Sequence, residues 1–268
     1  MRGGRGSAMG RRGGGRMTAV TVVGTGAIGG AVATALRAGD VPGCTLAVAL
    51  NSSAPREQVV AAVTAADVVV EATTTAVAGD LIRTAVSAGT DIVVCSCGVL
   101  ADRSPAELCA GPGRILLPSG AIGGLDVLAA AARAGRIGAT VTHTTVKCPS
   151  ALGLPELIGA QVEVFRGSAR EAARRYPRTS NASIALAFAT VGLDRLEVVV
   201  VADPAATSTT HRVRWVSSVG DYQFDFRNAV DETSGGRTSL ITAWSVLEML
   251  AGLHRGFGPG VLVESGAA

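Results

Sequence analysis

The 268-residue chain has few aromatic and few charged side chains. Phe, Trp and Tyr together make up 3% of the residues, and Asp, Glu, Lys and Arg make up 17%. The hydrophobic share is 48% and consists mostly of Ala and Val. A core of this kind favours valine-rich buried parallel strands with alanine-rich helices packed on them. The length is sufficient for one large domain or two smaller ones.

The cysteines lack the number and spacing of a disulfide framework. There are five of them, an odd number, and Cys95 and Cys97 at the end of an expected strand have no two further ligands nearby for a metal ion. We therefore expect buried free thiols in a reducing cytosol and no metal site.

The body of the chain has no excess of positive charge. The formal net charge of +3 includes +5 from the arginines of residues 1–16, which leaves −2 for the rest. This balance argues against a nucleic-acid-binding body. We expect residues 1–16 to be a disordered Arg/Gly tail, or an extension ahead of a natural start at Met17. Weak nucleic-acid binding by the tail is the alternative, which deletion of residues 1–16 would test.

Residues 17–36 contain no charged side chain and in this respect resemble a secretion signal. Four glycines interrupt the stretch, however, and they suit a strand, a phosphate-binding turn and a helix start better than a membrane helix. We expect a cytoplasmic protein without a membrane segment.

The first part of the chain alternates strands and helices. We predict strands at 18–23, 44–50, 67–71, 91–95 and 114–117, and helices at 28–38 and 76–88. Alternation at this spacing predicts parallel βαβ units. The fold class is therefore α/β, with a doubly wound Rossmann domain over residues 17–119.

The pattern changes after Gly124. We predict strands at 139–147, 161–165, 196–202, 211–216 and 222–227, and helices at 168–175 and 183–190. Residues 120–236 should form an α+β open-sheet domain for substrate binding and dimerisation, one sheet face being covered by these helices or by a second subunit. A last helix at 238–253, capped near Ser234 or Thr238, should return to the first domain, so that residues 237–268 join it.

A glycine motif follows the first strand. Gly24 would permit the turn, Gly26 would let the backbone approach a pyrophosphate, and Gly29 would let helix and strand pack. The pyrophosphate would sit at the helix start near Ile28. The second strand ends at Asn51 without a carboxylate to bind a ribose or repel a 2′-phosphate, so NADP or dual use is at least as favoured as strict NAD. Arg56 is either a phosphate partner or a solvated charge.

The chain resembles the L-aspartate dehydrogenase family over about residues 20–250. The most specific matching piece is Pro118-Ser119-Gly120-Ala121-Ile122-Gly123-Gly124-Leu125-Asp126. The other pieces, in order, are Gly24-Thr25-Gly26-Ala27-Ile28-Gly29, Val70-Glu71-Ala72-Thr73, Ser96-Cys97-Gly98-Val99-Leu100-Ala101-Asp102, Gly167-Ser168-Ala169-Arg170-Glu171-Ala172, Gly192-Leu193-Asp194-Arg195, Ala202-Asp203-Pro204 and Arg237-Thr238-Ser239.

The resemblance implies a homodimer that interconverts aspartate and oxaloacetate plus ammonia with NAD(P), through iminoaspartate; some members supply iminoaspartate for NAD biosynthesis. It places the catalytic histidine at His211 and nicotinamide-side contacts at Ala121 and Asn181. An imidazole suits a base for the ammonium proton because it changes charge near neutral pH. The complete expected cofactor set is Gly24, Gly26, Ala27, Ile28, Gly29, Asn51, Thr73, Ala121 and Asn181.

Substrate carboxylates need cations and hydrogen-bond donors. Lys147 could supply the cation or form a structural salt bridge, and Arg237 at a helix start favours an anionic partner. Ser119, Thr238 and Ser239 could donate further hydrogen bonds. Asp126 is expected to cap the following helix, and His143 and His254 to be packed or surface side chains.

Several positions depart from the family pattern, chiefly Thr209, Cys148 and Arg237. They keep two alternatives open. One is a related dehydrogenase or imine reductase that acts on another amino acid, and the other is an NAD(P)-binding homologue without turnover.

Overall fold

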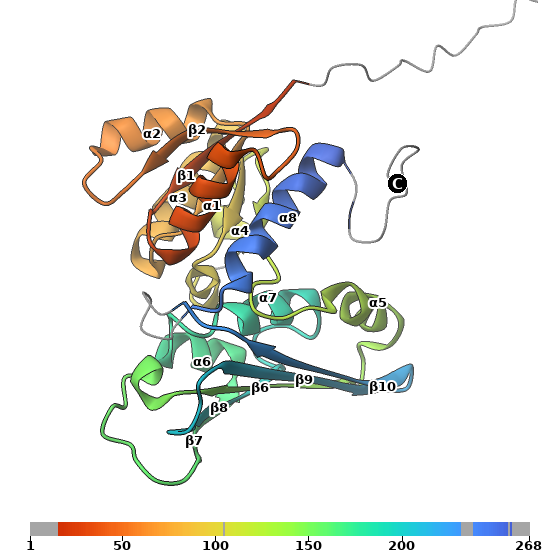
Figure 1. Cartoon of the computed structure of the whole chain (residues 1–268). Helices are drawn as coiled ribbons and strands as arrows, with labels where there is room; N and C mark the ends of the chain where they lie inside the picture. The colour runs from red at the N-terminus through yellow and green to blue at the C-terminus, as the bar shows by residue number, and fades with distance from the viewer. Residues whose placement is uncertain (1–15, 104, 232–237, 257, 259–268) are drawn as a thin grey trace, which may run out of the picture.

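The computed structural model describes residues 16–103, 105–231, 238–256 and 258. Figure 1 shows two domains, each built on one five-stranded sheet. The structure confirms the α/β fold class with a Rossmann-like domain and a second open sheet.

The sheet of the first domain is wholly parallel, in the order β2-β1-β3-β4-β5. Its central strands are runs of valine that are buried on both faces, as expected for a sheet covered by helices on each side. The strands are β1 (Thr18–Val23), β2 (Cys44–Leu50), β3 (Val68–Glu71), β4 (Asp91–Val94) and β5 (Ile115–Leu116).

Helices cover both faces of this sheet. One buried cluster joins the strands to α1 (Ala27–Ala38) and α8 (Ile241–Arg255), and a second joins them to α2 (Arg56–Ala65) and α3 (Thr75–Ala88). The helix α1 ends where Gly39 adopts φ 79°, a left-handed conformation that glycine takes at no steric cost. The short segments η1 (Cys97–Ala101) and α4 (Pro105–Leu108) follow β4.

The second sheet is mixed, in the order β10-β9-β6-β8-β7. Only β6 and β8 pair in parallel, and the other pairs are antiparallel. Its strands are β6 (Thr140–Lys147), β7 (Val162–Ser168), β8 (Glu197–Ala202), β9 (Thr209–Ser217) and β10 (Gly220–Asn228). The segment η2 (Pro149–Leu152) follows β6.

Three helices lie between this sheet and the first domain (Figure 1). They are α5 (Leu125–Gly135), α6 (Ala169–Arg175) and α7 (Asn181–Ala189). The helix α6 starts with a capping box, in which the side chains of Ser168 and Glu171 each accept a hydrogen bond from the other's backbone N–H. The opposite face of the sheet carries no helix in the part of the chain that the structure describes.

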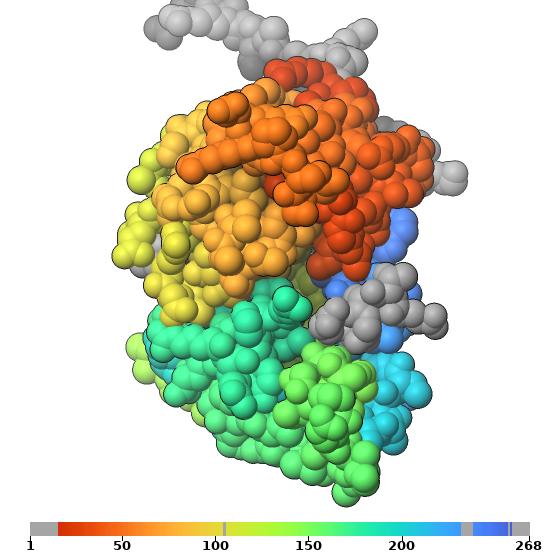
Figure 2. Space-filling view, turned by 90° about the vertical axis from the view of Figure 1, so that its left-hand side faces the viewer, coloured from red at the N-terminus to blue at the C-terminus, as the bar shows by residue number. Residues whose placement is uncertain are grey.

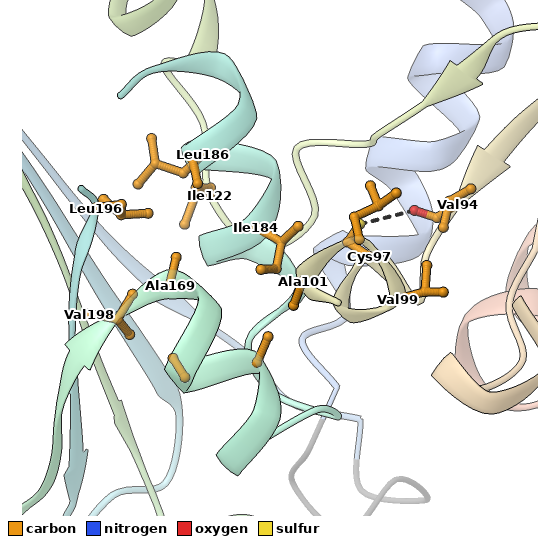
Figure 3. Packing of buried hydrophobic residues seen from close by; sticks show 14 of the residues in the cluster. Val94, Cys97, Val99, Ala101, Ile122, Ala169, Ile184, Leu186, Leu196 and Val198 are labelled. Carbon is orange, nitrogen blue, oxygen red and sulfur yellow. Dashed lines mark hydrogen bonds between the residues drawn. The ribbon is translucent and has the colours of Figure 1, made fainter. Parts of the chain in front are cut away.

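One buried cluster runs from the first sheet through η1 into the second domain. In Figure 3 the segment η1, with Cys97 and Ala101, lies beside α7 with Ile184 and α6 with Ala169. Polar contacts reinforce this junction, since Arg174 pairs with Asp102 at 2.7 Å and the guanidinium of Arg170 donates to the carbonyl of Ala101. In Figure 2 the first domain, coloured red to yellow, lies in direct contact with the second domain, coloured green to cyan.

The start of the last helix was predicted wrongly. Ser239 forms an antiparallel bridge with Val230 instead, and α8 begins at Ile241 after Leu240, without a side-chain cap from any described residue. The backbone of Thr238 is held by that pairing, because its carbonyl accepts from the Asp231 N–H at 2.8 Å. Ser234 and Arg237 lie outside the described residues.

Two smaller expectations were also wrong. Gly124 is the N-cap of α5, and Asp126 lies in the first turn. Its negative charge interacts favourably with the helix dipole there, but its side chain does not cap the helix. Cys109 is exposed and Cys148 is partly exposed, whereas Cys44, Cys95 and Cys97 are the buried free thiols expected.

Candidate dinucleotide and substrate site

The glycine turn lies where the strand order of the first sheet reverses, between β1 and β3. Ligands of open α/β sheets bind at the carboxyl ends of the strands at such a point. Gly24 has φ 98°, and a Cβ there would stand 2.3 Å from the carbonyl oxygen of Ala72. A Cβ on Gly29 would stand 1.8 Å from the carbonyl oxygen of Gly24. Both positions therefore require glycine so that strands and helix can pack.

Gly26, in contrast, has open space around the position that a Cβ would take. A Cβ there would meet no described atom within 4 Å, and Gly26 caps α1 without giving its first turn a side-chain acceptor. The backbone N–H groups of that turn are thus open to an anion at the positive end of the helix. The turn fits the pyrophosphate of a dinucleotide.

A buried carboxylate ties together the loops that follow β3 and β4. Glu71, at the end of β3, is fully buried and accepts from the N–H and hydroxyl of Thr73 at 2.6 and 2.7 Å. It also accepts from the N–H and hydroxyl of Ser96, both at 3.0 Å. Four donors offset the cost of burying the group and fix both loops at the ligand edge of the sheet.

A cleft lies between this edge and the second domain. The first domain contributes Ile28 of α1 and the thiols of Cys95 and Cys97, and the second domain contributes the start of α7 and the ends of β6 and β9. The cleft brings together seven of the residues predicted from the sequence, which are Ile28, Ala121, Lys147, Asn181, His211, Thr238 and Ser239.

His211 lies in the floor of the cleft, against a second histidine. Its Nδ1 is 3.1 Å from Nε2 of His143, and Nδ1 of His143 is 2.8 Å from the hydroxyl of Ser183 on α7. The side chains of His143 and His211 are 1% and 2% exposed. The Nε2 of His211 has no hydrogen-bond partner among the described residues.

Burial and a nearby cation keep both imidazoles neutral. Burial, with Lys147 second, lowers the pKa of His143 to about 4. Burial, followed by His143 and Lys147, holds the pKa of His211 well below its usual range. Near neutral pH each ring therefore has one N–H and one lone pair.

Lys147 ends β6 on the same face of the strand as His143. It is 4% exposed, and burial lowers the pKa of its ammonium to about 8. An ammonium in such a place binds an anion strongly because water does not compete. None of the cleft-lining residues that the structure describes is Asp or Glu.

Hydrogen bonds between side chains and backbone groups hold the turn after β5 and the start of α7 beside the cleft. The amide of Asn228 donates to the carbonyl of Ala121 at 2.7 Å, and the N–H of Gly120 donates to the hydroxyl of Ser245 at 3.1 Å. The amide oxygen of Asn181 accepts from the N–H of Gly98 at 3.1 Å, which links α7 to the first domain.

The other predicted residues lie outside the cleft itself. Asn51 is exposed at the end of β2, where its amide oxygen accepts from the N–H and hydroxyl of Ser53. Arg56 starts α2 in an exposed position, and Ser119 lines a neighbouring groove along α8. Arg237 lies outside the described residues. The remaining cofactor positions, Gly24, Gly26, Ala27, Gly29 and Thr73, follow the ligand edge of the first sheet.

Comparison with known proteins gives four relevant similarities. The chain is 35% identical over 254 residues to L-aspartate dehydrogenase 2 of Bordetella pertussis, covering 85% of this chain and 94% of that protein. The chain belongs to the aspartate dehydrogenase family. The family profile described as "Aspartate dehydrogenase, C-terminal" matches residues 126–253.

Solved structures agree with this assignment. The crystal structure of aspartate dehydrogenase from Thermotoga maritima has a TM-score of 0.68 and 25% identity, covering 91% of this chain and all of that one. A hyperthermophilic archaeal homoserine dehydrogenase solved with NADPH shares the fold at TM-score 0.58 and 12% identity, covering 90% and 99%. The predicted resemblance is thus confirmed, and family membership makes the protein an oxidoreductase that acts on an amino donor with a nicotinamide cofactor.

Sequence reasoning missed several residues of the site. His143 contacts His211 directly, which the sequence did not predict, and Arg178 and the thiols of Cys95 and Cys97 line the cleft without having been predicted to do so. Ser183 and Glu71 lie behind the cleft, where they hold His143 and the loop of Ser96, and they were not predicted either. Alternation along residues 139–147 does place His143 and Lys147 on one face of a strand. The contact between His143 and His211 could not be predicted, because it depends on the register of that strand against β9, which the sequence of one strand does not determine.

No helix among the described residues is long and apolar enough to cross a membrane.

Proposed function

We propose that the protein catalyses the reversible oxidation of L-aspartate to oxaloacetate and ammonia, through iminoaspartate. The observation that carries this proposal is the cleft itself, in which an unpartnered imidazole nitrogen of His211 and the ammonium of Lys147 meet beside the dinucleotide edge. A base and a carboxylate-binding cation are the two groups that the chemistry requires from the protein.

The dinucleotide would run along the carboxyl edge of the first sheet, from Asn51 past Gly26 toward Ile28 and Ala121. When bound, the nicotinamide supplies the two-electron acceptor of the oxidation. The glycine turn would hold the pyrophosphate, and Asn181 would set the position of the ring through its contact with Gly98.

The residues of the second domain would act on the substrate. Nε2 of His211 takes the ammonium proton of aspartate, so that the nitrogen lone pair can form the imine. Once His211 has released that proton to solvent, the same nitrogen takes a proton from the water that adds to the imine carbon and passes it to the nitrogen that leaves as ammonia. Lys147 binds a carboxylate, and Thr238 and Ser239 line the same cleft as hydrogen-bonding groups.

The decisive experiment is a substrate panel with matched variants. Purified protein is assayed at 340 nm with amino acids and NAD(P)⁺, and with 2-oxo acids, ammonia and NAD(P)H. Aspartate and oxaloacetate should give the highest kcat/KM. His211→Asn should lower kcat by about 10²- to 10⁴-fold and leave the Kd of NAD(P)H unchanged, since a general base contributes that range. Fastest turnover on another amino acid would contradict the substrate. Cofactor binding with no turnover on any substrate would contradict the activity.

Cofactor choice follows from the end of β2. Asn51 and Ser53 form a turn without a carboxylate, and Arg56 stands at the first position of the next helix. We propose use of NADP, or of both cofactors. Arg56→Ala should then raise KM for NADP about tenfold and leave KM for NAD unchanged, whereas Arg83→Ala, on the exposed surface of α3, should change neither. Equal effects of Arg56→Ala on both cofactors would contradict this assignment.

A homodimer would cover the open face of the second sheet. The strand register places Val146, Val199 and Val201 at the centre of that face, with ion pairs Arg212–Asp225 and Arg214–Asp221 beside them. An apolar centre with a charged rim is the usual anatomy of an interface. Light scattering should give twice the chain mass for the native protein and the chain mass for Val146→Lys, at a partly buried position of that face; a native monomer would contradict the dimer.

A further inference from the structure

His143 is a buried polar residue in apolar surroundings. Its neighbours in register on the two adjacent strands are Val198 of β8 and Val213 of β9, both at most 1% exposed. The ring nevertheless has a partner at each nitrogen, Ser183 at 2.8 Å and His211 at 3.1 Å. A buried polar side chain with two fixed partners from two different elements is held in one orientation.

The hydrogens of this chain of groups are coupled. One hydrogen lies between Nδ1 of His211 and Nε2 of His143. If His211 donates it, Nε2 of His211 carries a lone pair, and His143 must bear its own hydrogen on Nδ1 and donate it to Ser183. If His143 donates it, Nε2 of His211 is a buried N–H without a described acceptor. An unpaired buried N–H is the rarer of these two situations, so the first arrangement is favoured.

We propose that His143 is a positioning residue that sets the tautomer of His211. Anchored by Ser183, it accepts the Nδ1 hydrogen of His211 and keeps the Nε2 lone pair directed into the cleft. This proposal rests on the proposed role of His211 as the base.

The same contact serves His211 once it has taken a proton. The imidazolium would stand near the ammonium of Lys147, in a cleft that Arg178 also lines. The other titratable groups of the cleft are the thiols of Cys95 and Cys97, and none of the described lining residues has a carboxylate. A hydrogen bond donated by an imidazolium is stronger than one donated by a neutral ring. The neutral acceptor His143 thus stabilises the protonated state without adding a buried negative charge, in the position that a carboxylate holds in hydrolase triads.

Three variants and one control test the proposal. His143→Leu removes the acceptor, His143→Gln keeps an acceptor and a donor at similar reach, and Ser183→Ala removes the anchor. The control is Thr145→Val, which alters a buried neighbour on the same face of β6 that lies opposite His211 in register but outside the hydrogen-bonded chain.

The first readout is nitrogen-15 NMR of labelled histidine in the free protein, which reports the tautomer without any turnover. Wild type, Thr145→Val and His143→Gln should show His211 protonated at Nδ1. His143→Leu should shift His211 toward the Nε2–H form, and Ser183→Ala should give a mixture. An Nε2–H tautomer in the wild type, or an Nδ1–H tautomer that persists in both His143→Leu and Ser183→Ala, would overturn the proposal.

The second readout is steady-state kinetics over pH. His143→Leu should lower kcat about 30-fold or more at unchanged KM, with His143→Gln and Thr145→Val within about threefold of wild type. Loss of kcat in His143→Gln equal to that in His143→Leu would overturn the role, because both would then only perturb packing. If no substrate is turned over at all, the proposed function fails while the NMR readout still decides the tautomer. If His143→Leu does not fold, Ser183→Ala and His143→Gln carry both readouts.

Discussion

The ammonium of Lys147 is buried enough that a bound anion decides its charge. Its pKa of about 8 means that the free protein loses this proton within reach of ordinary assay conditions, unlike an exposed lysine. A dicarboxylate that binds the ammonium favours the protonated form. Anion binding is therefore strongest below pH 8 and declines as the pH rises through that value.

This coupling gives a prediction for ligand binding. The association constant of succinate, a non-reacting dicarboxylate, should fall by up to tenfold per pH unit above about pH 8. Lys147→Met should bind about 10- to 100-fold more weakly at pH 7 and lose most of this pH dependence, since a charge-assisted contact contributes about 1.5–3 kcal/mol. Calorimetric titration from pH 6.5 to 9.5 measures both effects. A pH-independent affinity in the wild type would show that Lys147 is not the anion partner.

The second residue-scale prediction concerns stability in acid. The folded pKa of His143, about 4, lies below the usual value of 6.5, so the unfolded chain binds more protons between these pH values. Stability contributed by the neutral ring is present above pH 6.5 and is lost as the pH falls toward 4. The loss attributable to His143 approaches about 3 kcal/mol. Urea unfolding at pH 7 and pH 4.5 should show a smaller decrease for His143→Gln than for wild type; equal decreases would contradict this account.

At this scale the sequence predicted the individual chemistry but not the partnerships. His211 stood out through the family resemblance, and Lys147 stood out because it ends the strand predicted at residues 139–147. Their contacts with His143 and Ser183 depend on the register of β6 against β9 and on where α7 packs. Both are set by tertiary packing between segments far apart in the chain.

Among the elements, α1 and its glycine turn offer a matched pair of substitutions. Gly29→Ala would place a Cβ 1.8 Å from a backbone oxygen, so helix and strand must separate; unfolding stability should fall by about 3 kcal/mol or more, by analogy with severe overpacking. Gly26→Ala meets no described atom within 4 Å and has a permitted φ of −72°. It should leave Tm nearly unchanged and weaken NAD(P)H binding at least tenfold, because the methyl group would occupy the pyrophosphate space.

Thermal unfolding and fluorescence titration of NAD(P)H measure these two effects separately. Normal cofactor affinity in Gly26→Ala would mean that the dinucleotide does not approach this turn. A stable Gly29→Ala protein would mean that α1 can shift without cost.

The strands were predictable because their valine runs and flanking glycines are local signals. Thr18–Val23 and Cys44–Leu50 were placed at their observed bounds. The helix α2 was not predicted, since only Val63 of its ten residues is buried and it has little of the periodic apolar pattern that marks a helix. The start of α8 was misplaced because the pairing of Ser239 with Val230 competes with helix formation.

For the whole molecule, the continuous core predicts cooperative unfolding. The buried cluster that crosses η1 leaves neither domain with a separate core on that side, so the two domains should unfold together. Calorimetry should give one transition with equal calorimetric and van't Hoff enthalpies. Ile184→Ala, at the junction, should lower Tm while keeping one transition, with a loss of about 2–5 kcal/mol. Two resolved transitions in the native protein would show that the junction does not couple the domains.

The walls of the cleft draw on positions from Ile28 to Thr242. A ribosome-bound chain therefore has no complete cleft until residue 242 of 268 has been added. Translation that stops earlier yields a product without the full constellation, even though the glycine turn near the amino end is already present. Such fragments would hold nucleotide at most and would not process substrate, so catalytic competence arises late and all at once during synthesis.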